Sequence, residues 1–114
     1  MFAPEMRQQT YFVLAALLDG PLHGYAIIKR ASELSGNRIR LATGTLYTAL
    51  DRLQEAGYVH LVSEEIVNGR ARRNYGLTDT GTSALNEEAE RLAAAARVVT
   101  DRRGRNQNPR MRPA

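Results

Sequence analysis

Apolar residues recur along the chain with spacings that predict helices separated by short breaks. Residues 5–19 are strongly apolar from Tyr11 to Leu18 and stop at Gly20-Pro21, which predicts a helix buried on most of its circumference. Residues 23–35 carry a helical stripe instead, and Gly36 is suited to cap that helix. The inward positions of this second helix are Tyr25, Ile28, Ala31 and Leu34. Both helices are therefore expected to contribute to the core.

A third helix is predicted from about Thr43 to Ala56, after a short extended segment at residues 38–41. Its inward face carries Leu46, Ala49, Leu50 and Leu53. Its outward face carries Gly44, Thr48, Asp51, Arg52 and Glu55. Because the apolar residues share one side of the helix, we expect the polar ones to face solvent or a partner.

A β-hairpin is predicted after Gly57, with strands at residues 58–67 and 70–77 and a turn at Asn68-Gly69, a strong hairpin signal. The return strand carries Arg70, Arg72 and Asn74 on one face and Arg73, Tyr75 and Leu77 on the other. A helix with small polar residues at its start, followed by an arginine-rich hairpin, is typical of a winged helix-turn-helix. The predicted fold class is mainly α with a small β-hairpin (α+β).

Thr78 is a suitable N-cap for a last helix that runs to about Val99. The apolar positions of this helix alternate between spacings of four and three: Leu85, Ala89, Leu92, Ala96 and Val99. Such a narrow seam favours packing against a partner helix. A second copy of the chain is the simplest partner, with the first helix adding to the dimer surface. The alternative is that the last helix lies on its own domain.

Three parts are expected along the chain. Residues 1–77 form the winged helix-turn-helix domain, residues 78–100 the C-terminal dimerisation helix, and residues 101–114 a disordered basic tail. The tail carries Arg102, Arg103, Arg105, Arg110 and Arg112. It either adds non-specific attraction to phosphate or is only a solvated terminus.

Composition narrows the possible partners. A chain of 114 residues fits one domain, and its net charge of +4 with a pI near 10.0 favours a polyanionic partner. Of its 16 basic residues only Lys29 is lysine, and arginine suits bidentate contacts to phosphate and guanine. A compositional bias towards arginine is the alternative explanation.

Enzymatic and metal chemistry have no support in the sequence. Cysteine is absent, and His23 and His60 have no companions that would complete a metal site. No nucleophile motif, phosphate-binding glycine loop or clustered carboxylate pair is present, so we expect neither catalysis nor a cofactor. No apolar run approaches the roughly 20 residues of a membrane span, and no signal-peptide pattern appears, which favours a cytoplasmic protein.

Several short motifs follow one another along the chain: Gly20-Pro21-Leu22-His23-Gly24-Tyr25, Gly44-Thr45-Leu46-Tyr47 with Ala49-Leu50, Gly57-Tyr58-Val59, Arg72-Arg73 with Tyr75, and Leu77-Thr78 with Gly81. In this order, over roughly residues 10–85, they resemble the PadR family of winged-helix transcriptional regulators, in its compact branch with a single C-terminal dimerisation helix. Thr48 departs from the proline that is usual in the family, and Asn74 and Gly76 depart from its usual aromatic and polar or basic residues. These departures affect any transfer of operator sequence, not the fold.

The resemblance implies a homodimer and a small-molecule effector that relieves repression. Without a separate ligand domain, the effector site is expected between the core and the dimer helices. Its candidate lining residues are Tyr11, Phe12, Leu85 and Leu92. The same residues serve equally well in core or dimer packing.

Candidate DNA-binding residues lie on three segments. The start of the third helix offers Thr45, Tyr47, Thr48 and Arg52, the wing offers Arg70, Arg72 and Arg73, and the segment before the helix offers Arg38 and Arg40. Two of them have an open alternative. Tyr47 either bonds a phosphate or packs on the second helix, and Arg73 either contacts DNA or lays its stem on the sheet.

Together these features predict a homodimeric DNA-binding regulator, most simply a repressor, that recognises a roughly palindromic operator in double-stranded DNA. A winged helix that serves only as a protein-interaction module is the main rival. Asp51 and Glu55 favour that rival, whereas the wing arginines oppose it. A small enzyme is the weaker rival, because no catalytic constellation is present.

Overall fold

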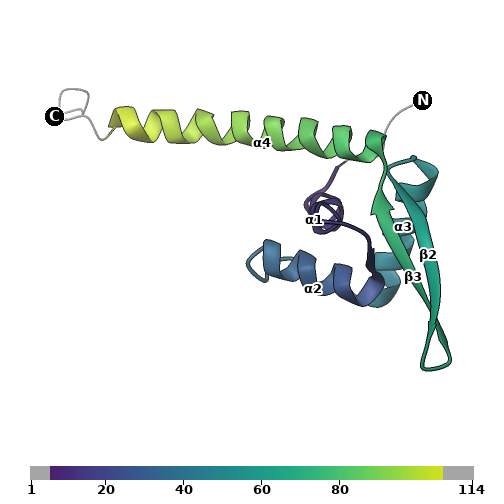
Figure 1. The fold of residues 1–114 in the computed structure, drawn as a ribbon. Helices are drawn as coiled ribbons and strands as arrows, with labels where there is room; N and C mark the ends of the chain where they lie inside the picture. The colour runs from purple at the N-terminus through teal and green to yellow at the C-terminus, as the bar shows by residue number, and fades with distance from the viewer. Residues whose placement is uncertain (1–5, 107–114) are drawn as a thin grey trace.

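The computed structural model describes residues 6–106 and contains four helices and a three-stranded sheet (Figure 1). The elements in chain order are α1 (Gln8–Ala16), β1 (Leu22–His23), α2 (Gly24–Leu34), α3 (Thr43–Glu55), β2 (Val59–Val67), β3 (Arg70–Leu77) and α4 (Asp79–Asn106). The predicted α+β winged helix-turn-helix is therefore confirmed. The predicted tail at residues 107–114 lies outside the described residues.

The sheet is antiparallel, with β3 in the middle and strand order β1-β3-β2. Asn68 and Gly69 have φ angles of 53° and 77°, the left-handed conformation that a tight hairpin turn requires and that Asn-Gly adopts readily. The pairing shifts register between Leu61 and Ser63, so β2 holds one extra residue, a β-bulge. The two-residue strand β1 had no sequence signal, because two residues show no periodicity.

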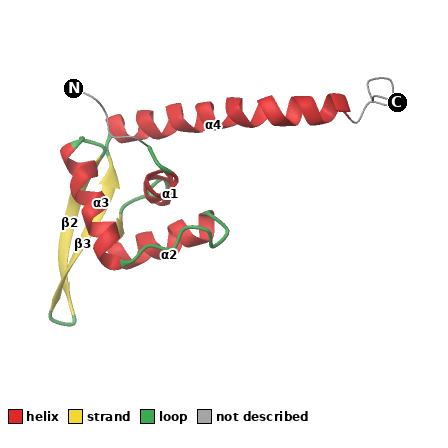
Figure 2. Ribbon diagram, turned by 180° about the vertical axis from the view of Figure 1, so that it is seen from behind, coloured by secondary structure: helices red, strands yellow, loops and turns green. Residues whose placement is uncertain are grey.

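Helices α1, α2 and α3 enclose the core together with the base of the sheet, and α1 lies between α2 and α4 in both views (Figures 1 and 2). The largest fully buried side chains are Leu14, Ile27, Leu46, Leu50 and Val13. The predicted inward stripe of α3 is confirmed, since its three leucines are buried and Ala49 is half-buried.

The predicted inward stripe of α2 is confirmed at Ala31, which is buried, and in part at Ile28, which is half-buried against the core. It is wrong at Tyr25 and Leu34, which are 79% and 42% exposed, and Gly24 and Ile27 face the core instead. Two adjacent isoleucines make the phase ambiguous in the sequence. The phase is set by Gly24, which lies against Tyr47 of α3, a contact that a larger residue cannot make without displacing the tyrosine.

Helix α4 is joined to the rest of the domain by Thr78. The Thr78 hydroxyl accepts a hydrogen bond from the Gly81 amide at 3.0 Å and donates one to the Gly57 carbonyl. The Thr78 amide donates to the Tyr58 carbonyl at 3.0 Å. One residue thus caps α4, as predicted, and ties its start to the end of α3.

Helix α4 extends past the predicted end at about Val99 and reaches Asn106, the last described residue, so residues 101–106 are helical and not irregular. Arg102 and Arg103 near its C-terminal end complement the helix dipole. Every residue from Glu90 to Gly104 is exposed, and this half of the helix projects beyond the domain (Figure 1). None of the helices in residues 6–106 is long and apolar enough to cross a membrane.

Gly81 is expected to be indispensable for the junction with α4. A Cβ at this position would lie 2.0 Å from the Tyr58 carbonyl oxygen, a backbone atom that cannot move aside. Gly81→Ala should lower the free energy of unfolding by about 2 kcal/mol or more, measured by urea denaturation. Gly104→Ala is the matched control, because a Cβ there meets nothing within 4 Å. Equal stability of the two variants would contradict the proposed packing.

Candidate nucleic-acid interface

The outward face of α3 forms one wall of a groove of about 760 Å³, and the start of α1 forms the other. Thr45, Thr48 and Arg52 line it from α3, and Arg7, Gln9 and Thr10 line it from the start of α1. Arg7 and Arg52 are its only charged lining residues, so the groove is positive. Three of the four predicted α3 residues thus lie together, whereas Tyr47 lines a different groove. Arg7 joins the three although the sequence did not single it out.

Arg7 carried only a weak sequence signal. It is the N-cap residue of α1 but makes no side-chain capping hydrogen bond, so its side chain is not tied to its own helix. An arginine just before a helix is common, and only the tertiary packing of α1 beside α3 brings it to this groove. Asp51 and Glu55, also exposed on α3, are not among the lining residues.

Thr48 presents a defined chemistry to this groove. Its hydroxyl donates a hydrogen bond to the Gly44 carbonyl one turn earlier, at 3.0 Å. The hydroxyl proton is therefore committed to the helix backbone. What remains to face a ligand is the methyl group and the oxygen lone pairs, which suit a thymine methyl or a base amino group.

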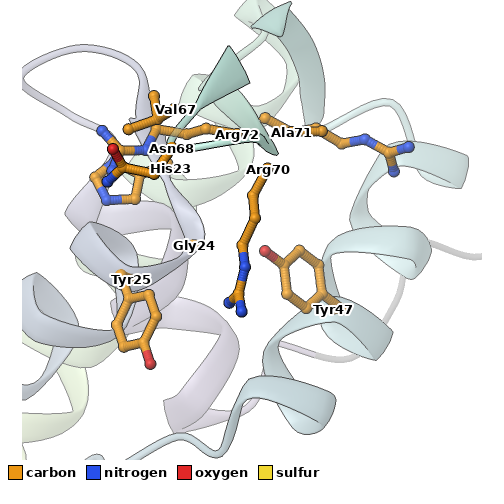
Figure 3. A pocket seen from close by; sticks show the side chains of 10 residues that line it. His23, Gly24, Tyr25, Tyr47, Val67, Asn68, Arg70, Ala71 and Arg72 are labelled. Carbon is orange, nitrogen blue, oxygen red and sulfur yellow. The ribbon is translucent and has the colours of Figure 1, made fainter. Parts of the chain in front are cut away.

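A second groove, of about 590 Å³, separates the starts of α2 and α3 from the wing (Figure 3). It is lined by His23, Gly24, Tyr25, Tyr47, Val67, Asn68, Arg70, Ala71, Arg72 and Arg73. The lining holds three arginines and no carboxylate, so this groove is also positive. Its residues come from three segments far apart in the sequence, residues 23–25, residue 47 and residues 67–73.

Tyr47 takes one of the two roles that the sequence left open, packing on the second helix. Its hydroxyl lies against Gly24, where a Cβ would come within 2.8 Å of it. The side chain is nevertheless 42% exposed and lines the second groove. The tyrosine therefore packs on α2 and still presents surface to a ligand.

The three wing arginines are not equivalent. Arg73 donates from Nε to Glu64 at 2.9 Å, and this hydrogen bond, with a smaller contribution from Tyr75, holds the pKa of the guanidinium above its ordinary value. The pair is exposed and is worth little in stability, but it compensates the charge of Arg73. Among the described residues neither Arg70 nor Arg72 forms a salt bridge. The free positive charge of the wing therefore comes from Arg70 and Arg72.

The other acidic wing residue is also engaged. The Asn74 side-chain amide donates to Glu65 at 2.9 Å and to Ser63 at 3.0 Å.

Arg38 and Arg40 are exposed, because Ile39 and Leu41 between and after them are buried. Neither arginine lines the two positive grooves.

The candidate effector residues lie at the junction of α1 and α4. Tyr11 and Phe12 make an edge-to-face contact with ring centroids 5.3 Å apart, and both line a cavity of about 280 Å³ with Glu88 and Leu92 of α4. Leu85 is 3% exposed and packs in the core of its own chain. It therefore belongs neither to this cavity nor to an exposed seam. No metal-binding cluster of His, Cys, Asp or Glu occurs in the part of the chain that is described.

A comparison with models of protein families identifies the family of this chain. The model of the transcriptional regulator PadR-like family matches residues 13–87, which span the core helices, the wing and the start of α4. The chain belongs to the PadR-like family of transcriptional regulators.

Individual relatives agree with this membership. The chain is 41% identical over 88 residues to the transcriptional regulator Rv3488 of Mycobacterium tuberculosis, covering 76% of this chain and 78% of that protein. It is 44% identical over 81 residues to an uncharacterised 37.1 kDa protein of a Streptomyces fradiae transposon, covering 71% of this chain but only 22% of the longer protein. The shared segment is thus also found within a larger chain.

Solved structures share the fold. The structure of Bacillus subtilis PadR in complex with operator DNA superposes with a TM-score of 0.64 at 26% identity, covering 73% of this chain and 47% of that one. A PadR-like transcription factor from Bacteroides fragilis gives a TM-score of 0.66 at 26% identity, covering 80% and 85% of the two chains.

The committed hydroxyl of Thr48 leads to a testable difference between two substitutions. Thr48→Val keeps a methyl group in the groove and should leave DNA affinity within about threefold, whereas Thr48→Ala removes it and should cost about fourfold per half-site. Fluorescence anisotropy on a bound duplex measures both. An equal loss in the two variants would mean that the hydroxyl itself contacts DNA.

Proposed function

We propose that this chain is a homodimeric repressor that binds double-stranded DNA at a roughly palindromic operator. The observation that carries the proposal is the pair of positive grooves on either side of the start of α3, neither of which has a carboxylate among its lining residues. The operator complex of Bacillus subtilis PadR, a protein of the same family, supports DNA as the partner.

In the proposed complex the first turns of α3 enter the major groove. Thr45 and Thr48 meet base edges there, and Arg52 reaches a guanine or a phosphate. Arg70 and Arg72 follow the neighbouring backbone or minor groove, while Arg38 and Arg40 add longer-range attraction. Arg73 contributes less than the other wing arginines because Glu64 compensates its charge.

The partner of α4 is proposed to be a second copy of the chain. The exposed half of α4 presents apolar side chains to solvent, among them Leu92, Val98 and Val99. Burial of these side chains against a second helix would be favourable. Leu85 is buried in the core of its own chain, and Ala89 is half-buried. The proposed seam therefore begins at Leu92 and continues through Ala96 and Val99. A two-fold dimer then places two α3 helices about one DNA turn apart.

A small-molecule effector is proposed to act at the α1–α4 junction. The cavity beside Tyr11 and Phe12 includes Leu92, which is also the first residue of the proposed seam. A ligand there would contact residues that set the position of α4, and so would change the spacing of the two α3 helices. Such a ligand is expected to be small and partly aromatic.

The wing arginines provide the direct test of DNA binding. Arg70→Ala with Arg72→Ala should abolish tight binding. The double variant removes two arginines from each subunit of the dimer, so the log–log salt slope should fall by about 3 to 4, since each neutralised phosphate contributes about 0.9. Fluorescence anisotropy across a salt series measures both quantities. Arg30→Ala is the control, because Arg30 is paired with Asp19 at 3.2 Å and lines neither groove. Unchanged binding by the double variant would favour the protein-interaction module.

The dimer has its own test at Leu92. This side chain is 46% exposed in the single chain, so Leu92→Glu should leave the fold intact but place a charge in the seam. Sedimentation equilibrium should then report a monomer. Leu34→Glu is the control, since Leu34 is similarly exposed at the end of α2 and lies outside the seam. A Leu92→Glu variant that remains dimeric would place the interface elsewhere.

A further inference from the structure

Tyr25 is the most exposed large apolar side chain of the described residues, with 79% of its surface accessible. It does not stabilise the core, and its neighbours in α2 that do so are Gly24 and Ile27. Removing the aromatic ring at this position should therefore change the free energy of unfolding of the protein very little. Its hydroxyl, in contrast, is a hydrogen-bond donor fully available to a ligand.

Arg70 approaches Tyr25 from the opposite wall of the second groove. Its side chain leaves the wing and points into the space between Tyr25 and Tyr47, which flank it from α2 and α3 (Figure 3). The guanidinium forms no salt bridge among the described residues. Arg70 and Tyr25 therefore border one space that no carboxylate lines.

The rest of the lining increases the positive potential of this space. Arg72 lines the same groove and forms no salt bridge among the described residues, while Arg73 is paired with Glu64. Gathering several cations costs electrostatic repulsion, and an anion bound between them offsets that cost. Guanidinium and phenol donors together match the oxygens of a phosphate group.

We propose that this groove holds one backbone phosphate of DNA, with the guanidinium of Arg70 neutralising its charge and the hydroxyl of Tyr25 donating to one of its oxygens. The proposal rests on the proposed DNA-binding function and adds Tyr25 to the binding residues. The protein groove lies between α3 and the wing. In the proposed complex α3 enters the major groove of DNA and the wing follows the neighbouring minor groove. The DNA backbone between the major and minor grooves must therefore pass through this part of the protein surface. Tyr25 thus fixes how deeply α3 enters, because it binds the backbone and not a base.

The test uses the full chain and a duplex obtained from a random-sequence selection with the unmodified protein. Tyr25→Phe removes one neutral donor to a charged oxygen, so affinity should fall about tenfold while the salt slope stays unchanged. Arg70→Ala should lower the slope by about 2, because the dimer carries two copies of Arg70. Tyr58→Phe is the matched control, since Tyr58 is buried and lines neither positive groove.

Single methylphosphonate substitutions along that duplex identify the phosphate. One position per half-site should weaken the unmodified protein more than it weakens Tyr25→Phe, because the variant has only its Arg70 contact to lose at that phosphate. Identical affinity and identical methylphosphonate profiles for Tyr25→Phe and the unmodified protein would overturn the Tyr25 site alone. Failure of the unmodified protein to select or bind any duplex would overturn the DNA-binding function, and the site with it. Circular dichroism melting should show that both tyrosine variants remain folded.

Discussion

The burial of one face of α3 is the constraint on which the rest of the molecule depends. Leu46, Leu50 and Leu53 are almost completely buried, and each such side chain contributes about 1.5–3 kcal/mol relative to an exposed one. Rotating α3 about its axis would expose all three. The outward residues Thr48 and Arg52 are therefore held in one orientation by hydrophobic packing on the opposite side of the same helix.

The two positive grooves follow from what packs around that helix. Gly24 allows α2 to approach Tyr47 closely, and the turn at Asn68-Gly69 returns β3 so that Arg70 faces the same region. On the other side, α1 brings Arg7 beside Arg52. The carboxylates of the wing are engaged in hydrogen bonds with Arg73 and Asn74. The grooves remain positive although the chain carries 12 acidic residues.

Features with local causes were predictable from the sequence. The Asn68-Gly69 turn, the bounds of β3, the inward stripe of α3 and the Thr78 cap each depend on a few neighbouring residues. Features decided by tertiary packing were not predictable: the phase of α2, the pairing of β1, the bulge near Val62 and the arrival of Arg7 beside α3. Helix α4 shows both cases, since its start was predicted, whereas the burial of Leu85 depended on how closely the helix lies against its own core.

The most direct measurement is a random-sequence DNA selection with the unmodified protein, followed by fluorescence anisotropy of the selected and a scrambled duplex across a salt series. A DNA-reading dimer should enrich an inverted repeat with half-sites about 10 base pairs apart. The selected duplex should bind far more tightly than the scrambled one, with a log–log salt slope of several units. No enriched motif, with equal weak binding to both duplexes, would contradict a sequence-specific DNA-binding function.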